Sequence, residues 1–318
     1  MSEYDYDLLV IGSGPGGQSA ALHAASLGKR VGLIERKPYL GGVSLQTATI
    51  PSKALREAAY LASRFSSGGM RDAVQIQGQH HSGFLGEVVG RKQAVIDRHE
   101  RLLLNQLMSH GVTLLPGEAG FHDPHTLKLR RSNGEEVQLS AAVIVLATGS
   151  RPRRPADVPF DRERVLDSTS ILKMRRLPRR LTVIGGGVIA CEFATIFAPL
   201  GVAVSLVDSH DHLLAYLDED IQQTLESDLL DMGIQLHMNT RIKQIRRMGE
   251  QVQLETDSGI KMETDAVLYA LGREPNYTSL DLAAAGLDAD DRGWVRINEH
   301  QQTARPHIYI IGDLAGRP

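Results

Sequence analysis

Two glycine-rich stretches, each followed by an acidic residue, have the residue types and spacing to bind a nucleotide. In the first, Gly12, Gly14 and Gly17 lie in GSGPGG directly after the apolar run YDLLVI, and Glu35 ends the next apolar run. Glycines at these places permit a tight turn, a close approach of backbone to a pyrophosphate, and packing of the next helix on the strand. A carboxylate at Glu35 is placed to accept hydrogen bonds from both hydroxyls of an adenosine ribose. The stretch therefore predicts a dinucleotide site.

The second stretch repeats this pattern far along the chain. Gly185, Gly187 and Ala190 follow the run LTVI, and Asp208 ends the run VAVSLV. Alanine is tolerated at the third glycine position, and in both stretches the helix start presents free amide groups to phosphates. Two such patterns in one chain predict two separate nucleotide-binding folds and two nucleotides.

The residues after Asp208 leave the choice of the second nucleotide open. An acid at this place favours the free 2′-hydroxyl of NAD, whereas a basic group nearby favours the 2′-phosphate of NADP. Ser209 and a protonated His210 would accommodate a phosphate, so both nucleotides remain candidates. We interpret His210, Asp211 and His212 as part of a charged loop rather than as a metal site.

The elements that must position these residues alternate between strands and helices. An alternation of this kind predicts an α/β fold with two Rossmann-like dinucleotide-binding domains. Residues 66–83, which include His80 and His81, are rich in glycine, serine and histidine and predict a surface loop without a metal, and residues 151–159 predict a linker. We expect strands at 6–11, 30–35, 112–121, 126–131, 141–146, 181–184, 202–207, 265–270 and 307–311, and helices at about 18–27, after residue 50, at about 87–109 and from 188.

Two strand ends carry further candidate contacts. Thr148 and Gly149 follow a buried strand in ATGSRP, where a turn brings the backbone close to a ligand or to another part of the chain. Asp313 follows the run HIYII, at the carboxyl end of a predicted strand. Open parallel sheets place their ligand contacts at this edge.

Composition excludes several classes of function. The 318 residues are 42% hydrophobic and 23% charged, as in a globular protein long enough for two domains, and the net charge of -3 provides no basic surface for nucleic acid. No apolar run approaches the roughly 20 residues that span a bilayer, and the N-terminus is polar, so we expect a cytoplasmic protein. The single cysteine, Cys191, rules out an intramolecular disulfide and indicates a small buried side chain.

A third stretch, GGVSLQTATIPSKALREA from Gly41 onward, gives the sequence a family resemblance. Together with ATGSRP, ACEFATIF and the two glycine patterns, it resembles the glutathione reductase-like pyridine nucleotide-disulfide oxidoreductases. In that family two cysteines, separated by four residues, precede IPSK; here Ser44 and Thr49 occupy those positions. A hydroxyl forms neither a disulfide nor a thiolate adduct, so the sequence keeps a flavin-docking frame without thiol chemistry.

The resemblance implies an NAD(P)-binding domain inserted into an FAD-binding domain. We expect residues 1–150 and 277–318 to bind FAD and residues 151–276 to bind NAD(P)H as a substrate. The family continues into a C-terminal dimerisation domain that this sequence lacks. The longer family form is therefore expected to be a homodimer, while the chain as given allows a monomer.

The resemblance also implies roles for individual residues. Lys53 of IPSK would place its ammonium group beside the flavin ring, where it stabilises the negative charge of the reduced form, and Glu192 would pair with it. The alternative for both is a surface ion pair. Asp313 would hold the ribityl chain of FAD, and Thr148 and Gly149 would lie against the flavin nucleotide. Further nucleotide contacts are implied at Arg36, Gly41, Gly42, Ser44 and Gly272.

The motifs YDYDLLVIGSGPGG, HLLAYLDED and VLYALGR are similar to those of family members that transfer hydride between NADPH and NAD+ through FAD. The resemblance implies that both nucleotides use the site at Gly185 to Ala190 in turn. Two alternatives remain: an FAD-dependent NAD(P)H oxidase or diaphorase that reduces oxygen or a quinone, and a non-catalytic nucleotide-binding fragment.

Overall fold

The computed structural model describes residues 3–67, 81–174 and 176–316, with side chains except those of residues 62–92. Contacts between residues divide the chain into two compact units. The first comprises Met1–Thr49, Val95–Arg151 and Arg273–Pro318, and the second comprises Ile50–Ala94 and Pro152–Gly272. In the described part of the chain, no helix is both long and apolar enough to span a membrane.

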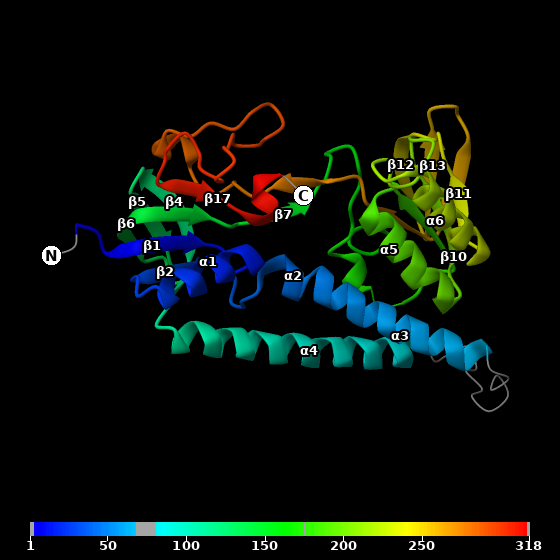
Figure 1. Ribbon diagram of the computed structural model, residues 1–318. Coiled ribbons are helices and arrows are strands. Elements are labelled where there is room, and N and C mark those ends of the chain that lie inside the picture. Colours follow the sequence, from blue (N-terminus) through cyan, green and yellow to red (C-terminus); the bar gives the residue numbers. More distant parts are fainter. Residues whose placement is uncertain (1–2, 68–80, 175, 317–318) are drawn as a thin grey trace. The chain divides into compact units, whose positions relative to one another are not determined.

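The first unit is built on a seven-stranded sheet (Figure 1). Its parallel part has the order β3-β2-β1-β6, and β17 pairs with the far side of β6. Pairing in register joins Val10 of β1 to Leu33 of β2 and to Val145 of β6. The strands are β1 (Tyr6–Ile11), β2 (Val31–Glu35), β3 (Thr113–Pro116), β4 (Glu118–Asp123), β5 (Thr126–Arg130), β6 (Glu136–Leu146) and β17 (Ile308–Ile310).

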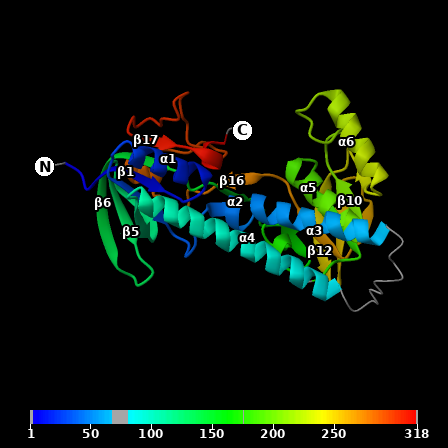
Figure 2. The ribbon, with the colours of Figure 1, turned by 60° about the horizontal axis from the view of Figure 1, so that its bottom comes forward.

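Strand β6 takes part in two kinds of pairing. Its first half, 136–140, pairs antiparallel with β5, and its second half, 141–146, pairs parallel with β1. Strands β4, β5 and the first half of β6 therefore form an antiparallel extension of the parallel sheet, as Figure 2 shows for β5 and β6. Beyond this sheet, β7 (Ser150–Pro152) pairs with β16 (Arg273–Pro275).

Helices pack on the first unit's sheet through apolar side chains. Leu103 and Leu107 of α4 share a core cluster with Val10 of β1 and Ala21 of α1. Figure 1 shows α1 beside β1 and β2, as expected for a helix that follows the first strand directly. The helical segments are α1 (Pro15–Ser26), α2 (Gly42–Gln46), α3 (Thr49–Ser67), α4 (His81–Ser109) and the short turns η4 (Leu282–Ala285) and η5 (Gly312–Ala315). Helices α3 and α4 each contain residues of both units.

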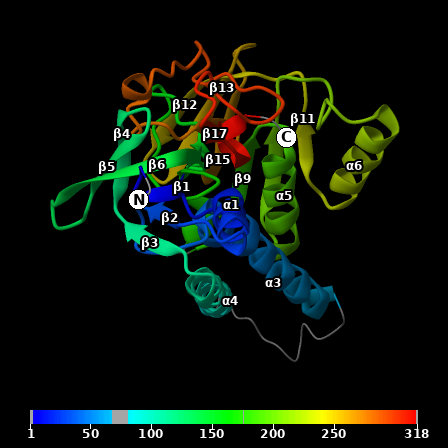
Figure 3. The same ribbon diagram turned by 60° about the vertical axis from the view of Figure 1, so that its left-hand side comes forward.

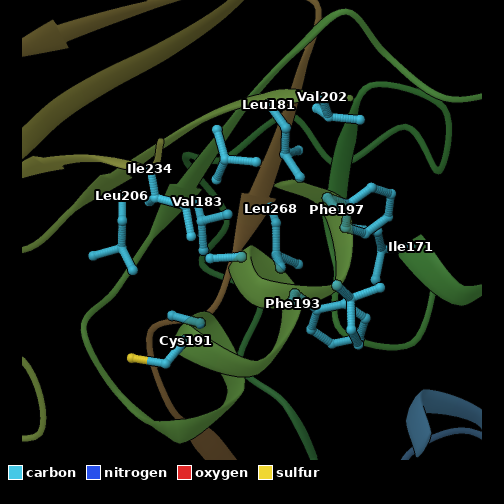
Figure 4. Packing of buried hydrophobic residues seen from close by; sticks show 14 of the residues in the cluster. Ile171, Leu181, Val183, Cys191, Phe193, Phe197, Val202, Leu206, Ile234 and Leu268 are labelled. Carbon is cyan, nitrogen blue, oxygen red and sulfur yellow. The ribbon is translucent and has the colours of Figure 1, made fainter. Parts of the chain in front are cut away.

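The second unit contains a five-stranded parallel sheet with the order β11-β10-β9-β15-β8. Helix α5 runs alongside this sheet (Figure 3), and its Phe193 and Phe197 pack against Val183 and Leu268 (Figure 4). The elements are β8 (Val165–Asp167), η2 (Ile171–Lys173), β9 (Arg180–Ile184), α5 (Val188–Phe197), η3 (Ala198–Leu200), β10 (Ala203–Val207), α6 (Glu219–Asp231), β11 (Gln235–His237) and β15 (Ala266–Tyr269).

A small antiparallel sheet completes the second unit. It has the order β12-β13-β14, formed by β12 (Ile242–Met248), β13 (Gln251–Thr256) and β14 (Lys261–Thr264). Every second residue of β13 is buried, and Val252 and Leu254 share a core cluster with Val267 of β15. The sheet therefore covers part of the larger one through its apolar face.

The α/β fold expected from the sequence is confirmed. Residues Ile50–Ala94 group with the second unit, where Leu55 and Ala59 of α3 pack with the core around α5, and the expected domain bounds stay a prediction. Two local differences stand out. The helices reach into the expected loop at 66–83, since α3 ends at Ser67 and α4 begins at His81; His80 lies outside the described residues. The expected linker at 151–159 begins inside β7.

Candidate nucleotide sites

The first glycine loop, residues 12–17, joins β1 to α1. Gly12 has φ +106°, and a Cβ there would lie 2.4 Å from the carbonyl oxygen of Ala147. A Cβ at Gly17 would lie 1.9 Å from the carbonyl oxygen of Gly12, so only glycine fits either position. Gly14 is extended at the N-cap of α1, and a Cβ there would meet nothing within 4 Å. The loop therefore leaves the N-terminal end of α1 accessible to an anion.

Glu35 lies at the end of β2 and is held by the first glycine loop. Its Oε2 accepts hydrogen bonds from the Ser13 hydroxyl at 2.7 Å and from the Ser13 amide at 3.1 Å. Its Oε1 accepts a hydrogen bond from the Lys37 amide at 2.9 Å. A carboxylate oxygen can accept two hydrogen bonds, so Oε1, which accepts one here, can accept another from a ribose hydroxyl.

The turn at Gly41 and Gly42 rests on the same loop. The Gly41 amide donates a hydrogen bond to the fully buried Ser13 hydroxyl at 3.2 Å. Gly42 has φ +61°, and a Cβ there would lie 2.7 Å from Gly14 Cα. The turn opens α2, on which Ser44 is half buried. The structure thus joins the dinucleotide motif to the segment in which the family carries its cysteines.

Thr148 supplies an unsatisfied polar atom in the first unit. Its Oγ1 is buried and has no hydrogen-bond partner among the described residues. Its carbonyl accepts a hydrogen bond from the Asn276 side chain at 3.3 Å, and the Asn276 amide donates to the Gly149 carbonyl at 3.0 Å. A buried hydroxyl without a partner is unfavourable, and a hydroxyl-rich nucleotide would satisfy it. The residues of this unit therefore fit an FAD nucleotide.

Asp313 follows β17 and contacts Ser150. Ser150 Oγ donates to Asp313 Oδ2 at 3.0 Å and accepts a hydrogen bond from Arg273 Nε at 2.7 Å. The Asp313 side chain is 67% exposed, so its carboxylate is accessible to a ligand. Arg36, by contrast, lies 3.6 Å from Glu118 in an ion pair at the end of β2.

The second glycine loop, residues 185–190, joins β9 to α5. Gly185 has φ +121°, and a Cβ there would lie 2.9 Å from the carbonyl oxygen of Ala270. Gly187 is extended at the N-cap of α5, and Ala190 is fully buried on that helix. This geometry matches that of the first loop. Gly272, with φ +85°, lies two residues after Ala270, and its carbonyl accepts a hydrogen bond from the Arg153 amide at 3.2 Å.

Asp208 lies beside the second glycine loop at the end of β10. A Cβ on Gly186 would approach the Asp208 carboxylate to 3.1–3.2 Å, so the acid rests against the loop backbone. Asp208 Oδ1 accepts hydrogen bonds from the His210 amide at 2.8 Å and from His210 Nδ1 at 2.6 Å. The Asp208 side chain is only 5% exposed, whereas that of His210 is 66% exposed.

Lys53 and Glu192 form an ion pair within the second unit, between the side chains of α3 and α5. Ser52 Oγ also donates a hydrogen bond to Glu192 Oε1, at 3.3 Å. The Lys53 side chain is 54% exposed and that of Glu192 is 20% exposed. The pairing expected from the sequence is thus present, and the catalytic role of the pair stays a prediction.

The single cysteine offers no redox thiol. Cys191 is buried on α5, and burial raises the pKa of its thiol to about 11. A thiol with so high a pKa is almost entirely protonated at neutral pH and is a poor nucleophile. Within the part of the chain that the structure describes, no group of three or more His, Cys, Asp or Glu side chains is arranged to hold a metal ion.

Each of the two glycine loops, with the acid beside it, has the local geometry of a dinucleotide-binding loop. The chain belongs to the pyridine nucleotide-disulphide oxidoreductase family, whose sequence pattern matches residues 6–318. It is 39% identical over 313 residues to a soluble pyridine nucleotide transhydrogenase of Vibrio atlanticus, covering 98% of this chain and 66% of that protein. It is 38% identical over 319 residues to the protein of that name from Escherichia coli, covering 99% of this chain and 67% of the relative.

Solved structures share the fold. The HOCl-induced flavoprotein disulfide reductase RclA from Escherichia coli aligns with a TM-score of 0.83 and 27% identity, over 98% of this chain and 66% of that one. LpdA from Mycobacterium tuberculosis aligns with a TM-score of 0.87 and 28% identity, over 97% and 68%. The chain therefore spans about two thirds of the length of the proteins that it matches.

Three residues of the sites were not expected from the sequence. Ser13 joins Glu35 to the Gly41 turn, Ser150 joins Asp313 to Arg273, and Asn276 holds the turn at Thr148. A polar residue inside a glycine motif was the available signal for Ser13. The contacts of Ser150 and Asn276 join residues more than a hundred positions apart, so no local pattern indicates them.

Proposed function

We propose that the chain carries the FAD and nicotinamide nucleotide sites of a transhydrogenase that transfers hydride from NADPH to NAD+ and back, without a redox disulfide. The observation that carries the proposal is the pair of nucleotide loops, each with its acid, in a chain whose family cysteine positions hold Ser44 and Thr49. The relatives of about 38% identity that carry the name soluble pyridine nucleotide transhydrogenase support it.

In the first unit, the residues would bind FAD by its nucleotide part. The first glycine loop would present backbone amides to the pyrophosphate, and Glu35 would accept ribose hydroxyls. The Thr148 hydroxyl and the exposed Asp313 carboxylate would receive polar groups of the cofactor. The chemistry that FAD supplies when bound is the acceptance and return of a hydride.

In the second unit, the residues would bind and orient the nicotinamide nucleotides. The second glycine loop would hold the pyrophosphate of either nucleotide, and Asp208 would lie at its adenosine ribose. Lys53 would supply a positive charge to an adjacent reduced flavin, and Glu192 would hold that ammonium group in place. No general acid or base is needed, because a hydride carries its own electron pair.

The activity is tested by an anaerobic assay that contains the chain, FAD, NADPH and the NAD+ analogue thio-NAD+, whose reduced form absorbs at its own wavelength. We expect reduced thio-NAD+ to form at the rate at which NADPH is consumed. The same assay in air, without thio-NAD+, separates the oxidase alternative. If NADPH is oxidised only when oxygen or a quinone is present, the transhydrogenase proposal is wrong.

The cytoplasmic location, the dimeric state of the longer form and the assignment of FAD to the first unit remain predictions. Gel filtration with light scattering at several concentrations measures the oligomeric state and shows whether this chain alone is monomeric. Co-purification of FAD with the chain, followed by release on denaturation, measures the stoichiometry of the cofactor.

A further inference from the structure

The acid of the second nucleotide site, Asp208, accepts hydrogen bonds from an exposed histidine, His210. His210 Nδ1 lies 2.6 Å from Asp208 Oδ1, and the His210 amide reaches the same oxygen at 2.8 Å. An ionised carboxylate can only accept hydrogen bonds, so Nδ1 carries a hydrogen. The other ring nitrogen, Nε2, is then an acceptor while the ring is neutral. The ring is 66% exposed while the carboxylate is 5% exposed, so His210 lies between the acid and solvent.

This pair occupies the place at which nucleotide-binding folds distinguish NAD from NADP. Asp208 packs against the glycine loop backbone at Gly186. The following residues, 209–212, contain no lysine or arginine. A fixed carboxylate would repel the 2′-phosphate of NADP, and a fixed cation would favour it. A transhydrogenase needs one site that accepts both, and a histidine is the side chain whose charge changes between pH 5 and 8.

We propose that His210 selects between the two nicotinamide nucleotides by its protonation state, an inference that rests on the proposed function. With His210 neutral, Asp208 leaves a net negative charge that favours the 2′-hydroxyl of NAD. With His210 protonated, the pair is neutral overall and Nε2 becomes a hydrogen-bond donor for a 2′-phosphate. The ring thus adjusts one site to two substrates.

Other titratable groups near the pair come from three neighbouring elements and from its own loop. His237 of β11 pairs with β10, and its backbone carbonyl accepts a hydrogen bond from the Asp208 amide at 3.1 Å. Glu226 of α6 lies 3.3 Å from His212 Nδ1, and Cys191 of α5 stays protonated. On its own loop, the pair is followed by Asp211 and His212. None of these other groups makes a hydrogen bond to the Asp208 carboxylate in the described part of the chain, whereas His210 forms two.

The test measures the dissociation constants of NADP+ and NAD+ for the 318-residue chain by isothermal titration calorimetry at pH 6 and pH 8. We expect the preference for NADP+ over NAD+ to rise about tenfold as pH falls, equivalent to about 1.4 kcal/mol. In His210→Gln, whose amide still donates to Asp208, this pH dependence should disappear. In Asp208→Asn, which removes the carboxylate charge without adding an Nε2 donor, NADP+ should bind at pH 8 more tightly than it binds to the unchanged chain at pH 8.

Two controls separate the possible outcomes. His212→Gln removes a neighbouring histidine that pairs with Glu226 instead, and it should keep the full pH dependence. A shift that survives in His210→Gln, or that is lost in His212→Gln or His237→Gln alone, overturns the role of His210. If the chain binds both nucleotides without any change of preference, only this inference fails. If it binds neither nucleotide at either pH, the proposed function fails with it.

Discussion

Ser13 holds Glu35 in place through two hydrogen bonds to one carboxylate oxygen, from its hydroxyl at 2.7 Å and from its amide at 3.1 Å. The same hydroxyl accepts a hydrogen bond from the Gly41 amide at 3.2 Å. One fully buried side chain therefore fixes both the acid at the end of β2 and the turn before α2. These hydrogen bonds restrain the Glu35 carboxylate and the Gly41 turn, and restraint of this kind lowers the entropic cost of binding a ligand.

Substitution of Ser13 by alanine should weaken FAD binding. The change removes one hydrogen bond to a carboxylate at a buried position, a loss of about 1–3 kcal/mol. We expect the dissociation constant of FAD to rise about tenfold, measured from flavin fluorescence on dilution. Ser26→Ala is the matched control, because that exposed hydroxyl donates a hydrogen bond to the His23 carbonyl at the end of α1, away from the glycine loop. Equal FAD affinity in the two variants would show that Ser13 does not position Glu35.

Gly42→Ala should destabilise the chain more than Gly28→Ala does. Both glycines have positive φ, +61° and +73°, so both substitutions strain the backbone by about 1 kcal/mol. A Cβ at Gly42 also lies 2.7 Å from Gly14 Cα, whereas at Gly28 it meets nothing within 4 Å. We expect Gly42→Ala to lower the thermal midpoint further and to release flavin. Identical melting curves for the two variants would contradict the close packing of the two turns.

Lys53→Met should slow flavin reduction while leaving FAD bound. The methionine keeps the length of the side chain but removes the cation that we propose for the reduced flavin, a loss of roughly a hundredfold in rate. Stopped-flow absorbance after mixing with NADPH under anaerobic conditions measures this rate. Arg56→Met removes an exposed cation three residues later on α3 and should leave the rate unchanged. Lys53→Arg, which keeps the charge, should recover part of it; unaltered kinetics in Lys53→Met would leave the ion pair with Glu192 a structural contact.

His307 gives the first unit a pH-dependent stability. Its ring stacks on that of His125, with 3.7 Å between the ring centroids. Burial lowers the pKa of His307, the nearby His125 and Arg305 lower this pKa further, and a hydrogen bond with the Pro124 carbonyl opposes them. Because the folded chain disfavours the protonated form, unfolding takes up a proton as pH falls.

The free energy of unfolding should therefore fall as pH drops from about 6.5, the ordinary histidine pKa, through the lowered pKa of the folded state. The loss should be small, because solvent reaches the ring and weakens these interactions. Urea unfolding at a series of pH values measures it. His307→Asn should flatten this part of the profile, and His99→Gln, at an exposed position on α4, should not. A steeper fall in His307→Asn would reverse the assigned sign.

The parts of the fold that local sequence patterns determine were predictable. The strand 6–11 matches β1 because an apolar run ends at Gly12, whose positive φ only glycine adopts easily. The second loop follows the same rule at Gly185. The start of α4 at His81 was predicted six residues too late, because residues 81–86 carry no apolar period that separates a helix from a loop.

Features that depend on distant pairing were not predictable. The antiparallel sheet β12-β13-β14 was not expected, although the alternation in β13 is visible once its partners are known. The Lys53–Glu192 pair was expected only through the family resemblance, since 139 positions separate the two residues. The bonds of Ser13 and His210 to their acids depend on how each loop folds back on a strand end, which residue spacing does not reveal.

In the proposed reaction, hydride moves between nucleotides through a flavin and without a thiol. The most direct measurement is an anaerobic titration of the flavin-loaded chain with NADPH, followed in the visible absorption spectrum. We expect one NADPH for each FAD to bleach the flavin completely and NAD+ then to restore the colour. A flavin that NADPH does not bleach, or that needs two equivalents because a second redox group accepts electrons, would contradict it.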